Sequence, residues 1–287
     1  MTNLDLPPAP SRPMTVSQLC AWGWSTYLGR NRSVRSTKSI VLGIGNWFGP
    51  KLLSSLEYQD LIDWLDHLRS AGDKPSTIRR KVGTLSGLLK RAQLAGFISR
   101  VPAMPKVTGV TRGRLRWLSE PEETKLLDHL MATSPDVGYL VVFLLDTGMR
   151  PGEALALRWS DVFPERGVVT LYATKTDRER SVPLTARARA ALEAMHGKIG
   201  GPFQHISIDK LNRAWNVSRR AIGLGDDAQV VPYVCRHTFA SRLAQRGVSL
   251  YTIGTLLGHT NSATTTIYAH LATHNLRAAV DTLENRP

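Results

Sequence analysis

The chain has 287 residues, of which 42% are hydrophobic and 21% charged, a composition that argues against wholesale disorder. Its 37 lysines and arginines against 23 acidic residues give a net charge of +14, which suits a polyanionic partner such as nucleic acid. The longest apolar run, Val137 to Leu145, is too short for a bilayer, so no membrane partner is expected. The two cysteines, Cys20 and Cys235, form neither a disulfide framework nor a cysteine zinc site, so we expect a soluble cytoplasmic protein.

The first third of the chain is its most basic part and has the apolar periodicity of helices. Residues 1–110 carry a net charge of +9 and the remainder +5, which favours contact with a phosphate backbone. Apolar side chains recur at helical spacing in four segments, Val16–Leu28, Val34–Phe48, Tyr58–Leu68 and Pro75–Leu94. In the last segment Asp73 or Ser76 is the expected N-cap and Gly96 the expected stop. The pattern predicts a small helical bundle over residues 14–98.

Residues 99–116 are rich in proline, glycine and arginine and contain no acidic residue. This composition predicts a linker, which acts either as a solvated tether or as a basic segment that follows a DNA backbone. We expect DNA contacts from basic residues of the last predicted helix, of this linker and of a later turn, namely Arg79, Arg80, Lys81, Lys90, Arg91, Lys106, Arg112, Arg114 and Arg178.

Residues 117–287 show a mixture of helical and strand patterns. Ser119 and Glu122 form an S-x-x-E capping box that opens a helix, and the long apolar run that follows is expected to be a buried helix. Two stretches, Gly167–Thr174 and Arg180–Leu184, flank a polar turn and predict a β-hairpin. Helical patterns then cover Thr185–Met195, Ile208–Ile222, Pro232–Gln245, Leu250–Leu257 and Ser262–His270. The chain is therefore predicted to be mainly α with a small antiparallel β-sheet, and its second domain to be α+β.

The chemistry of the second domain lies in an ordered series of cationic groups that ends in a tyrosine. The series runs through T-G-M-R-P-G-E-A-L, a lysine in the polar turn, Y-V-C-R-H-T-F-A-S and L-G-H, and Tyr268 follows His259 by nine residues. The sequence has no G-x-S-x-G motif, no P-loop and no H-E-x-x-H motif, and we predict no metal site. This order of motifs resembles the tyrosine recombinases, or phage integrases, across essentially the whole chain.

The resemblance implies a site-specific DNA recombinase that cleaves and rejoins DNA through a 3′-phosphotyrosyl intermediate, in integration, excision or resolution. No cofactor is implied, because the phosphotyrosyl bond preserves the energy of the broken phosphodiester. The implied catalytic residues are Arg150, Lys175, Tyr233, Arg236, His259 and Tyr268, with Glu153 and His237 as supporting residues.

In this assignment the tyrosine at position 268 is the nucleophile and the two arginines bind the non-bridging phosphate oxygens. Lys175 protonates the departing 5′ oxygen, and Arg178 and Arg180 are nearby alternatives for that task. His259 donates a hydrogen bond to the phosphate, and Glu153 orients its neighbours.

The chain departs from the family at one position, because Tyr233 stands where the usual H-x-x-R pattern has its histidine. A tyrosine can donate a hydrogen bond to phosphate but accepts a proton poorly near neutral pH, so no general base is expected there. His237 follows Arg236 directly, and one residue along a helix turns a side chain by about 100°. We therefore expect a structural role for His237.

The resemblance also implies the architecture and the partners. It implies that residues 14–98 form a SAM-like core-binding domain and that residues 117–287 form a catalytic domain of the tyrosine recombinase and type IB topoisomerase kind. The two would clamp double-stranded DNA as a dimer on each recombination site and a tetramer in the synapse, with accessory DNA-bending proteins as further partners. Residues 273–285 are expected to form a helix that docks on a neighbouring protomer, or else covers its own core. The short stretch before Thr15 leads us to expect no arm-site domain.

Two other functions fit parts of the same pattern. A relaxing enzyme of the type IB topoisomerase kind shares the chemistry and acts without a partner duplex. A non-catalytic DNA-binding protein is the second alternative, because Leu250–Ile267, with Gly258 in the turn, resembles a helix-turn-helix.

Overall fold

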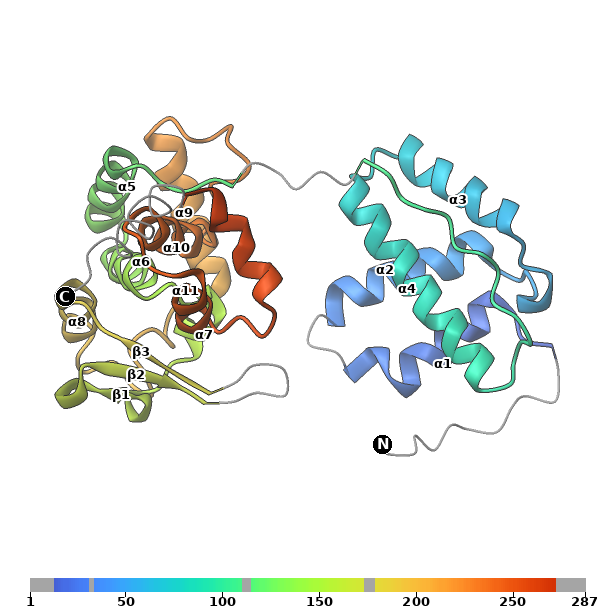
Figure 1. The fold of residues 1–287 in the computed structure, drawn as a ribbon, viewed down its shortest axis with the longest axis horizontal. Helices are drawn as coiled ribbons and strands as arrows, with labels where there is room; N and C mark the ends of the chain where they lie inside the picture. The colour runs from blue at the N-terminus through green and yellow to red at the C-terminus, as the bar shows by residue number, and fades with distance from the viewer. Residues whose placement is uncertain (1–12, 31–33, 110–114, 173–178, 272–287) are drawn as a thin grey trace, which may run out of the picture. The chain divides into compact units, whose positions relative to one another are not determined.

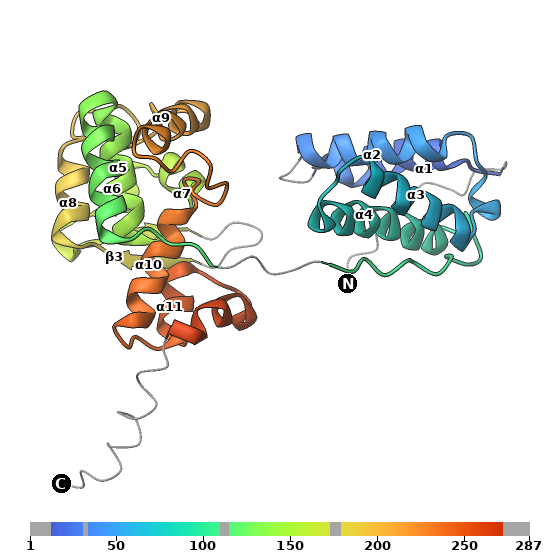
Figure 2. The same cartoon turned by 90° about the horizontal axis from the view of Figure 1, so that it is seen from above.

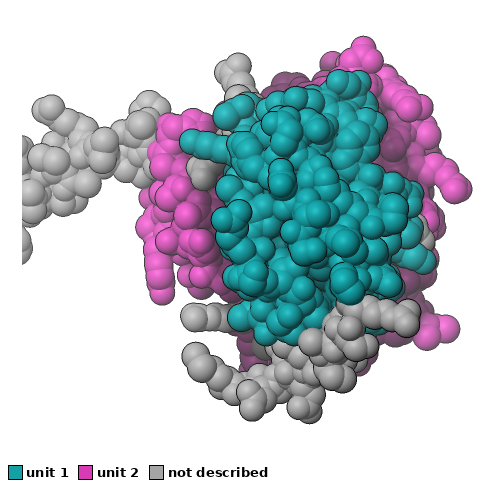
Figure 3. Space-filling view, turned by 90° about the vertical axis from the view of Figure 1, so that its right-hand side faces the viewer, with its two compact units in different colours: residues 1–113 teal, residues 114–287 magenta. Residues whose placement is uncertain are grey.

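The computed structural model describes residues 13–30, 34–109, 115–172 and 179–271 of the chain. The chain divides into two compact units, unit 1 (residues 1–113) and unit 2 (residues 114–287), each with its own hydrophobic core (Figures 1 and 3). Most of the described residues are helical and the strands form one small antiparallel sheet, which confirms the predicted fold class. Within these ranges no helix is long and apolar enough to cross a membrane.

Unit 1 is a bundle of helices, as the periodicity predicts. Its described part contains α1 (Val16–Thr26), α2 (Val34–Phe48), α3 (Tyr58–Ser70) and α4 (Pro75–Leu94), with 3₁₀ turns at Leu28–Arg30 and Leu53–Ser55. The apolar stripes of the helices meet in a core that includes the fully buried Leu19, Ile44, Leu61 and Leu85. The burial of one face of each helix supplies the stability that helices of this length lack in isolation.

Helix α4 begins differently from the prediction. Its N-cap is Lys74, whose side chain makes no capping hydrogen bond, and Pro75 occupies the first turn. Asp73, one of the two expected caps, forms an ion pair with Lys81 at 2.5 Å, and Ser76 lies inside the helix. The helix can start without a side-chain acceptor because proline presets the backbone φ of the first turn and has no N–H to satisfy.

The two described ends of the predicted linker pack against the unit to which each belongs. Val101 and Val107 pack against the core of unit 1. Arg116 belongs to unit 2, where its guanidinium pairs with Glu122 at 2.5 Å and with Asp227 at 2.9 Å. Apolar side chains therefore anchor the first end of this segment, and ion pairs with acidic residues of unit 2 anchor the other end.

Unit 2 combines helices with the small sheet (Figures 1 and 2). The strands pair in the order β1-β2-β3, and Val169 faces Val182 across the β2–β3 ladder. Their bounds are β1 Val162–Phe163, β2 Val168–Leu171 and β3 Arg180–Pro183. The predicted hairpin is present, and the two-residue strand β1 is an addition that is too short to show a period-2 pattern.

The last four helices in the described part of unit 2 begin and end close to their predicted bounds, and three further helices precede them. They are α5 (Glu120–Thr133), α6 (Pro135–Thr147), α7 (Pro151–Ala156), α8 (Ala186–Glu193), α9 (Ile208–Ala221), α10 (Val234–Gln245) and α11 (Leu250–Leu257), with 3₁₀ turns at Trp159–Asp161 and Pro164–Arg166. The predicted capping box of α5 is present, with the Ser119 hydroxyl accepting from the backbone N–H of Glu122.

Helix α6 is the predicted buried helix, and it packs against α5, α8 and α10. It ends at Gly148, whose φ of +62° is the left-handed conformation that glycine adopts without strain. A Cβ at this position would lie 2.4 Å from the Phe239 ring. The tight turn then delivers the chain to Arg150 at the start of α7.

The last described element, η5 (Ser262–Leu271), is a 3₁₀ segment instead of the predicted α-helix. It contains three consecutive threonines, residues 264–266, and β-branched side chains crowd the preceding turn of an α-helix. The segment packs against α10 and α11 and buries Thr265 and Tyr268. The predicted docking helix, residues 273–285, lies outside the described residues.

Candidate active site

Segments that are far apart in the sequence meet on one side of α10 in unit 2. Strand β3 contacts α11, and η5 contacts both α10 and α11, while the turn between α6 and α7 reaches α10 through a hydrogen bond described below. This arrangement gathers the predicted arginines, histidines and terminal tyrosine of the motifs into one site.

Arg236 is the most deeply buried cation of this site, with 1% of its surface exposed. Its Nη1 donates to the carbonyl oxygen of Gly148 at 2.9 Å, and its Nη2 donates to the carbonyl oxygen of Leu257 at 2.6 Å. Burial lowers the pKa of the guanidinium, but an arginine keeps its proton in proteins. Because carbonyl oxygens carry no net charge, these bonds orient the guanidinium without neutralising it, which is the electrostatic requirement for binding an anion.

Glu153 joins two further arginines. Its Oε1 accepts from Nη1 of Arg150 at 2.6 Å, and its Oε2 accepts from Nη2 of Arg180 at 2.6 Å. The same carboxylate also accepts from the backbone N–H of Arg150 at 2.9 Å and so caps α7. Burial raises the pKa of Glu153, but the hydrogen bonds and charges of Arg180 and then Arg150 outweigh it and hold that pKa below its usual value. The carboxylate is therefore an anchor for arginines and a poor base.

Arg180 lies against the turn that precedes His259. Its side chain is 6% exposed, and a Cβ added to Gly258 would lie 2.6 Å from its Nη1. The φ of Gly258 is +69°, so this turn requires glycine for its backbone conformation as well as for the space that the guanidinium occupies. The sequence motifs did not single out Arg180 as a site residue beyond its place near Lys175. The available signal was strand alternation, because Arg180 and Val182 share the buried face of β3.

His259 follows the C-terminal glycine of α11 and contacts η5. Its Nδ1 lies 2.8 Å from the hydroxyl of Thr265, which is itself 3% exposed. Burial, followed by the positive charge of Arg236 and of the other two arginines, lowers the pKa of His259 to about 4. The ring is therefore neutral at physiological pH and serves as a hydrogen-bonding group. Sequence reasoning missed Thr265, since a threonine within a run of threonines carries no distinguishing pattern.

Tyr268 is buried, with 1% of its surface exposed, and its hydroxyl lies 2.9 Å from Nδ1 of His237. Burial raises the pKa of this phenol, while the charge of Arg236 acts in the opposite direction. Burial and then the charge of Arg236 lower the pKa of His237. Segment η5 brings the tyrosine to the face of α10 on which His237 lies, so the residue expected to have a structural role contacts the predicted nucleophile directly.

Tyr233 caps the N-terminus of α10 and is 40% exposed. Its ring meets the ring of His237 edge to face, with centroids 5.3 Å apart. It is also close enough to act electrostatically on Arg236 and Tyr268. The residue that replaces the usual histidine thus lies at the border of the site and is more exposed than the groups around it.

The remaining predicted site residues divide into described and undescribed ones. Lys175, Arg178, Arg112 and Arg114 lie outside the described residues. In unit 1, Arg79, Lys90 and Lys106 are exposed. Three others have partners within unit 1, namely Arg80 with Ser36, Lys81 with Asp73, and Arg91 over the ring of Tyr27.

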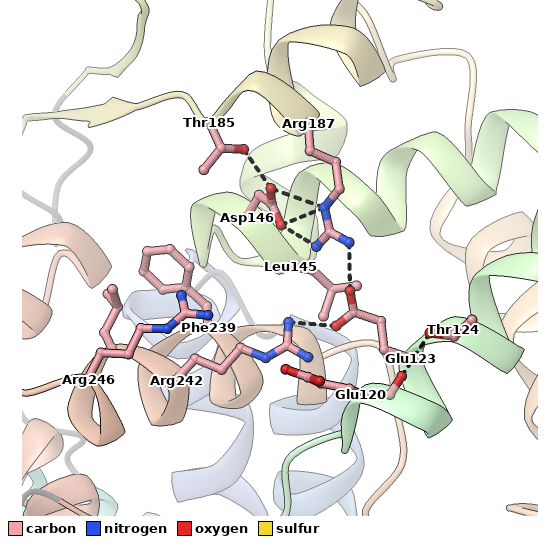
Figure 4. Close-up of a pocket in the computed structure, with 11 residues that line it drawn as sticks. Glu120, Glu123, Thr124, Leu145, Asp146, Thr185, Arg187, Phe239, Arg242 and Arg246 are labelled. Carbon is pink, nitrogen blue, oxygen red and sulfur yellow. Dashed lines mark hydrogen bonds and ion pairs between the residues drawn. The ribbon is translucent and has the colours of Figure 1, made fainter.

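A separate polar cavity of about 490 Å³ lies among α5, α6, α8 and α10 (Figure 4). The Arg187 side chain points between Asp146 and Glu123 and pairs with both, and Arg242 also pairs with Glu123, at 2.7 Å (Figure 4). Glu123 is 7% exposed, and its carboxylate links an arginine of α8 to one of α10. We assign this network to the framework that fixes α10, because its charges neutralise one another.

Comparison with known proteins places this geometry in context. The family model described as the phage integrase family matches residues 116–275, which is more than half of the chain. The tyrosine recombinase XerC of Xanthomonas campestris pv. campestris is 27% identical over 270 residues, which cover 88% of this chain and 81% of that protein. The integrase of Escherichia phage P2 is 31% identical over 221 residues, covering 74% of this chain and 60% of that protein.

Solved structures share the fold. The Tn1549 transposon integrase in complex with a circular intermediate DNA has a TM-score of 0.77 at 18% identity, covering 94% of this chain and 99% of that one. The XerH site-specific recombinase bound to a palindromic difH substrate has a TM-score of 0.70 at 21% identity, covering 94% of this chain and 85% of that one. At these identities the likeness concerns the fold.

Proposed function

The chain belongs to the phage integrase family of tyrosine recombinases and is a site-specific DNA recombinase, and we propose that it cuts DNA with the hydroxyl of Tyr268. The observation that carries this assignment is the convergence of Tyr268 with the buried Arg236 and His259 on one side of α10. A phenol, an unneutralised guanidinium and a neutral imidazole are the groups that attack on a phosphodiester requires.

The arginines of the site bind the scissile phosphate in this proposal. The transition state at phosphorus concentrates negative charge on the non-bridging oxygens, and guanidinium groups bind such oxygens in a bidentate manner. Two carbonyl oxygens orient Arg236, and Glu153 orients Arg150, so neither side chain needs to reorganise when the phosphate arrives. Preorganised donors of this kind contribute about 2.7–4 kcal/mol each to transition-state stabilisation.

The reaction transfers the phosphate to the protein and back. The phenol oxygen of Tyr268 forms a bond to phosphorus, the bond to the 5′ oxygen breaks, and a 3′-phosphotyrosyl ester results. Lys175, which the family resemblance assigns as the acid, supplies the proton for the departing 5′ oxygen. A 5′-hydroxyl of the partner strand then attacks the phosphotyrosyl bond, releases the tyrosine and completes the exchange.

We infer double-stranded DNA as the substrate, bound by a homodimer on each site and by a tetramer when two sites pair. A lambda integrase dimer bound to a core site, with a TM-score of 0.71 to this chain, supports this assembly. The exposed Arg79, Lys90 and Lys106 of unit 1 suit contacts with the phosphate backbone. Accessory DNA-bending proteins, a docking role for residues 273–285 and a cytoplasmic location are part of the same proposal.

A suicide duplex tests the nucleophile. Duplexes that the purified protein retains from a random-sequence pool give the site, and a nick beside the mapped cut traps the cleaved state. The wild-type protein should form a covalent adduct with the labelled strand, and Tyr268→Phe should bind the duplex and form none. Tyr251→Phe is the matched control, since Tyr251 is 85% exposed on α11. Adduct formation by Tyr268→Phe would overturn the assignment.

The same duplexes separate recombination from the alternatives. Two marked duplexes should exchange strands in the presence of the protein, whereas a type IB relaxing enzyme removes supercoils without joining partners. Binding with neither adduct nor exchange would indicate a DNA-binding module.

A further inference from the structure

We propose that His237 is the general base that accepts the proton of Tyr268 as the phenol attacks the phosphate. This inference rests on the proposed function and assigns a residue for a task that Tyr233, in the place of the usual histidine, is unsuited to perform. It changes the role of His237 from a supporting residue to a catalytic one.

The contact between the two side chains has the geometry of proton transfer. Nδ1 of His237 lies 2.9 Å from the phenol oxygen of Tyr268, within the range of about 2.6–3.2 Å that a general base needs. The phenol is 1% exposed, and buried hydroxyl groups are generally paired with an acceptor. Burial raises the pKa of the phenol and lowers that of the imidazole, so the resting pair is a protonated phenol and a neutral ring.

Among the residues that the structure describes, the other possible bases of the site are occupied or unsuited. Both carboxylate oxygens of Glu153 accept hydrogen bonds from arginines. Nδ1 of His259 is engaged with Thr265, and the pKa of that ring is lowered to about 4, which makes it a weak base. Tyr233 carries a phenol, which donates a hydrogen bond readily and is a poor proton acceptor. His237 is the group whose neutral, basic nitrogen lies within hydrogen-bonding distance of the reacting oxygen.

Charged and titratable groups around His237 explain how substrate binding would make its imidazole a stronger base. Arg236 and Tyr233 face it from its own helix, Tyr268 from η5, and His259 from the turn after α11. The charge of Arg236 disfavours the imidazolium form in the free protein. A DNA phosphate bound to Arg236 offsets this charge and favours protonation of His237. The base therefore gains strength when its substrate is in place.

The step balances in protons and bonds. During cleavage the Tyr268 proton moves to Nδ1 of His237, the phenol oxygen bonds to phosphorus, and the 5′ oxygen leaves with a proton from the acid. During religation a 5′-hydroxyl attacks and gives its proton back to the acid, the tyrosine oxygen leaves, and His237 returns its proton to that oxygen. Because a phenol has an ordinary pKa of about 10 and an imidazole one of about 6.5, transfer is completed only as the oxygen bonds to phosphorus.

His237→Asn tests this role, since the amide oxygen can accept the hydrogen bond and cannot take up the proton. Single-turnover cleavage of the suicide duplex is measured between about pH 5 and pH 9, alongside DNA binding and thermal unfolding. We expect a fall of about 10²–10³-fold in the cleavage rate and loss of the rate increase that accompanies deprotonation of a histidine. We expect Tyr233→His in the His237→Asn background to restore part of the rate, because it returns an imidazole to the usual position.

Two results would overturn the proposal. One is a wild-type cleavage rate in His237→Asn, and the other is a reduced rate whose pH profile is unchanged, which a merely structural contact would give. His237→Gln replaces the first variant if the asparagine lowers the melting temperature. His196→Asn is the matched control, since His196 is exposed beside Trp159 in the same unit. If the wild-type protein forms no adduct through Tyr268, the proposed function itself fails and not the assignment of the base.

Discussion

Arg236 donates a hydrogen bond from Nη1 to the carbonyl oxygen of Gly148 at 2.9 Å, so the guanidinium on α10 is held by the turn that ends α6. The two residues are 88 positions apart, and the bond is buried. The conformation of one glycine therefore helps to set the position of the cation that we assign to the phosphate.

Gly148→Ala should destabilise unit 2 by about 2–4 kcal/mol, because the alanine is strained at φ +62° and its Cβ meets the Phe239 ring at 2.4 Å. Urea unfolding followed by circular dichroism measures the change. Gly43→Ala is the control: Gly43 lies in α2 with open space around it, so alanine should stabilise unit 1 by about 0.5–1 kcal/mol. A neutral effect of Gly148→Ala would show that the turn relaxes freely.

Arg236→Lys should reduce the single-turnover cleavage rate by about 10²–10³-fold with little effect on DNA binding. One ammonium group cannot span the carbonyl oxygens of Gly148 and Leu257 and also bind a phosphate in a bidentate manner. Rates come from the suicide duplex and affinities from a gel-shift titration. Arg213→Lys, at an exposed position of α9, should cleave normally. Equal losses of binding and cleavage in Arg236→Lys would contradict the proposal that Arg236 binds the scissile phosphate in the transition state.

Glu153→Gln should cost about 3 kcal/mol at neutral pH, because it leaves the buried Arg180 without a counter-charge. The folded-state pKa of Glu153 is below its unfolded value, so its stabilisation is fully present above about pH 4.5 and is lost as pH falls through the folded value. The difference in the free energy of unfolding between the wild-type protein and Glu153→Gln should therefore become smaller in acid.

Denaturation curves at pH 7 and at pH 3 check this dependence on Glu153. Asp66→Asn is the control, since Asp66 pairs with Arg69 on the surface of α3, and it should cost under about 1 kcal/mol. If the free energies of unfolding of the wild-type protein and of Glu153→Gln differ by the same amount at both pH values, the ionised carboxylate is not the source of the stability.

His259 should make the protein less stable in mild acid. Its folded-state pKa of about 4 lies below the usual value of about 6.5, so its contribution is present above pH 6.5 and is lost as pH falls toward 4. We expect a loss of about 1 kcal/mol, reduced from the full linkage value because the ring is partly exposed. His259→Gln should remove this part of the pH dependence. An NMR titration that gives His259 a pKa near 6.5 would show that burial and the neighbouring arginines do not lower this pKa.

Local patterns were sufficient for most of the fold. The capping box at Ser119, the apolar run of α6 and the glycine that ends α11 each depend on residues a few positions apart, and each is present as predicted. Contacts between distant residues could not be predicted in this way. Val107 is held by the core of unit 1 and Arg116 by acids of unit 2, which the composition of the linker does not reveal.

The candidate site divides in the same way. Motif order was sufficient to propose Arg236, His259 and Tyr268 as site residues, because each belongs to a short pattern in this sequence. The roles of Arg180 and His237 depend on contacts across 27 and 31 positions with Glu153 and Tyr268. Helical geometry places His237 relative to Arg236 but says nothing of where η5 will deliver the tyrosine.

Positions 180 and 258 constrain each other's evolution. The Arg180 guanidinium fills the space that a side chain on Gly258 would need, and the same guanidinium holds Glu153. Alanine at 258 is strained at φ +69° and also displaces the Arg180 guanidinium, which disturbs the ion pair that anchors Glu153. We expect related sequences that carry arginine at position 180 to keep glycine at position 258, and an alignment of such sequences checks this contact without a biochemical assay.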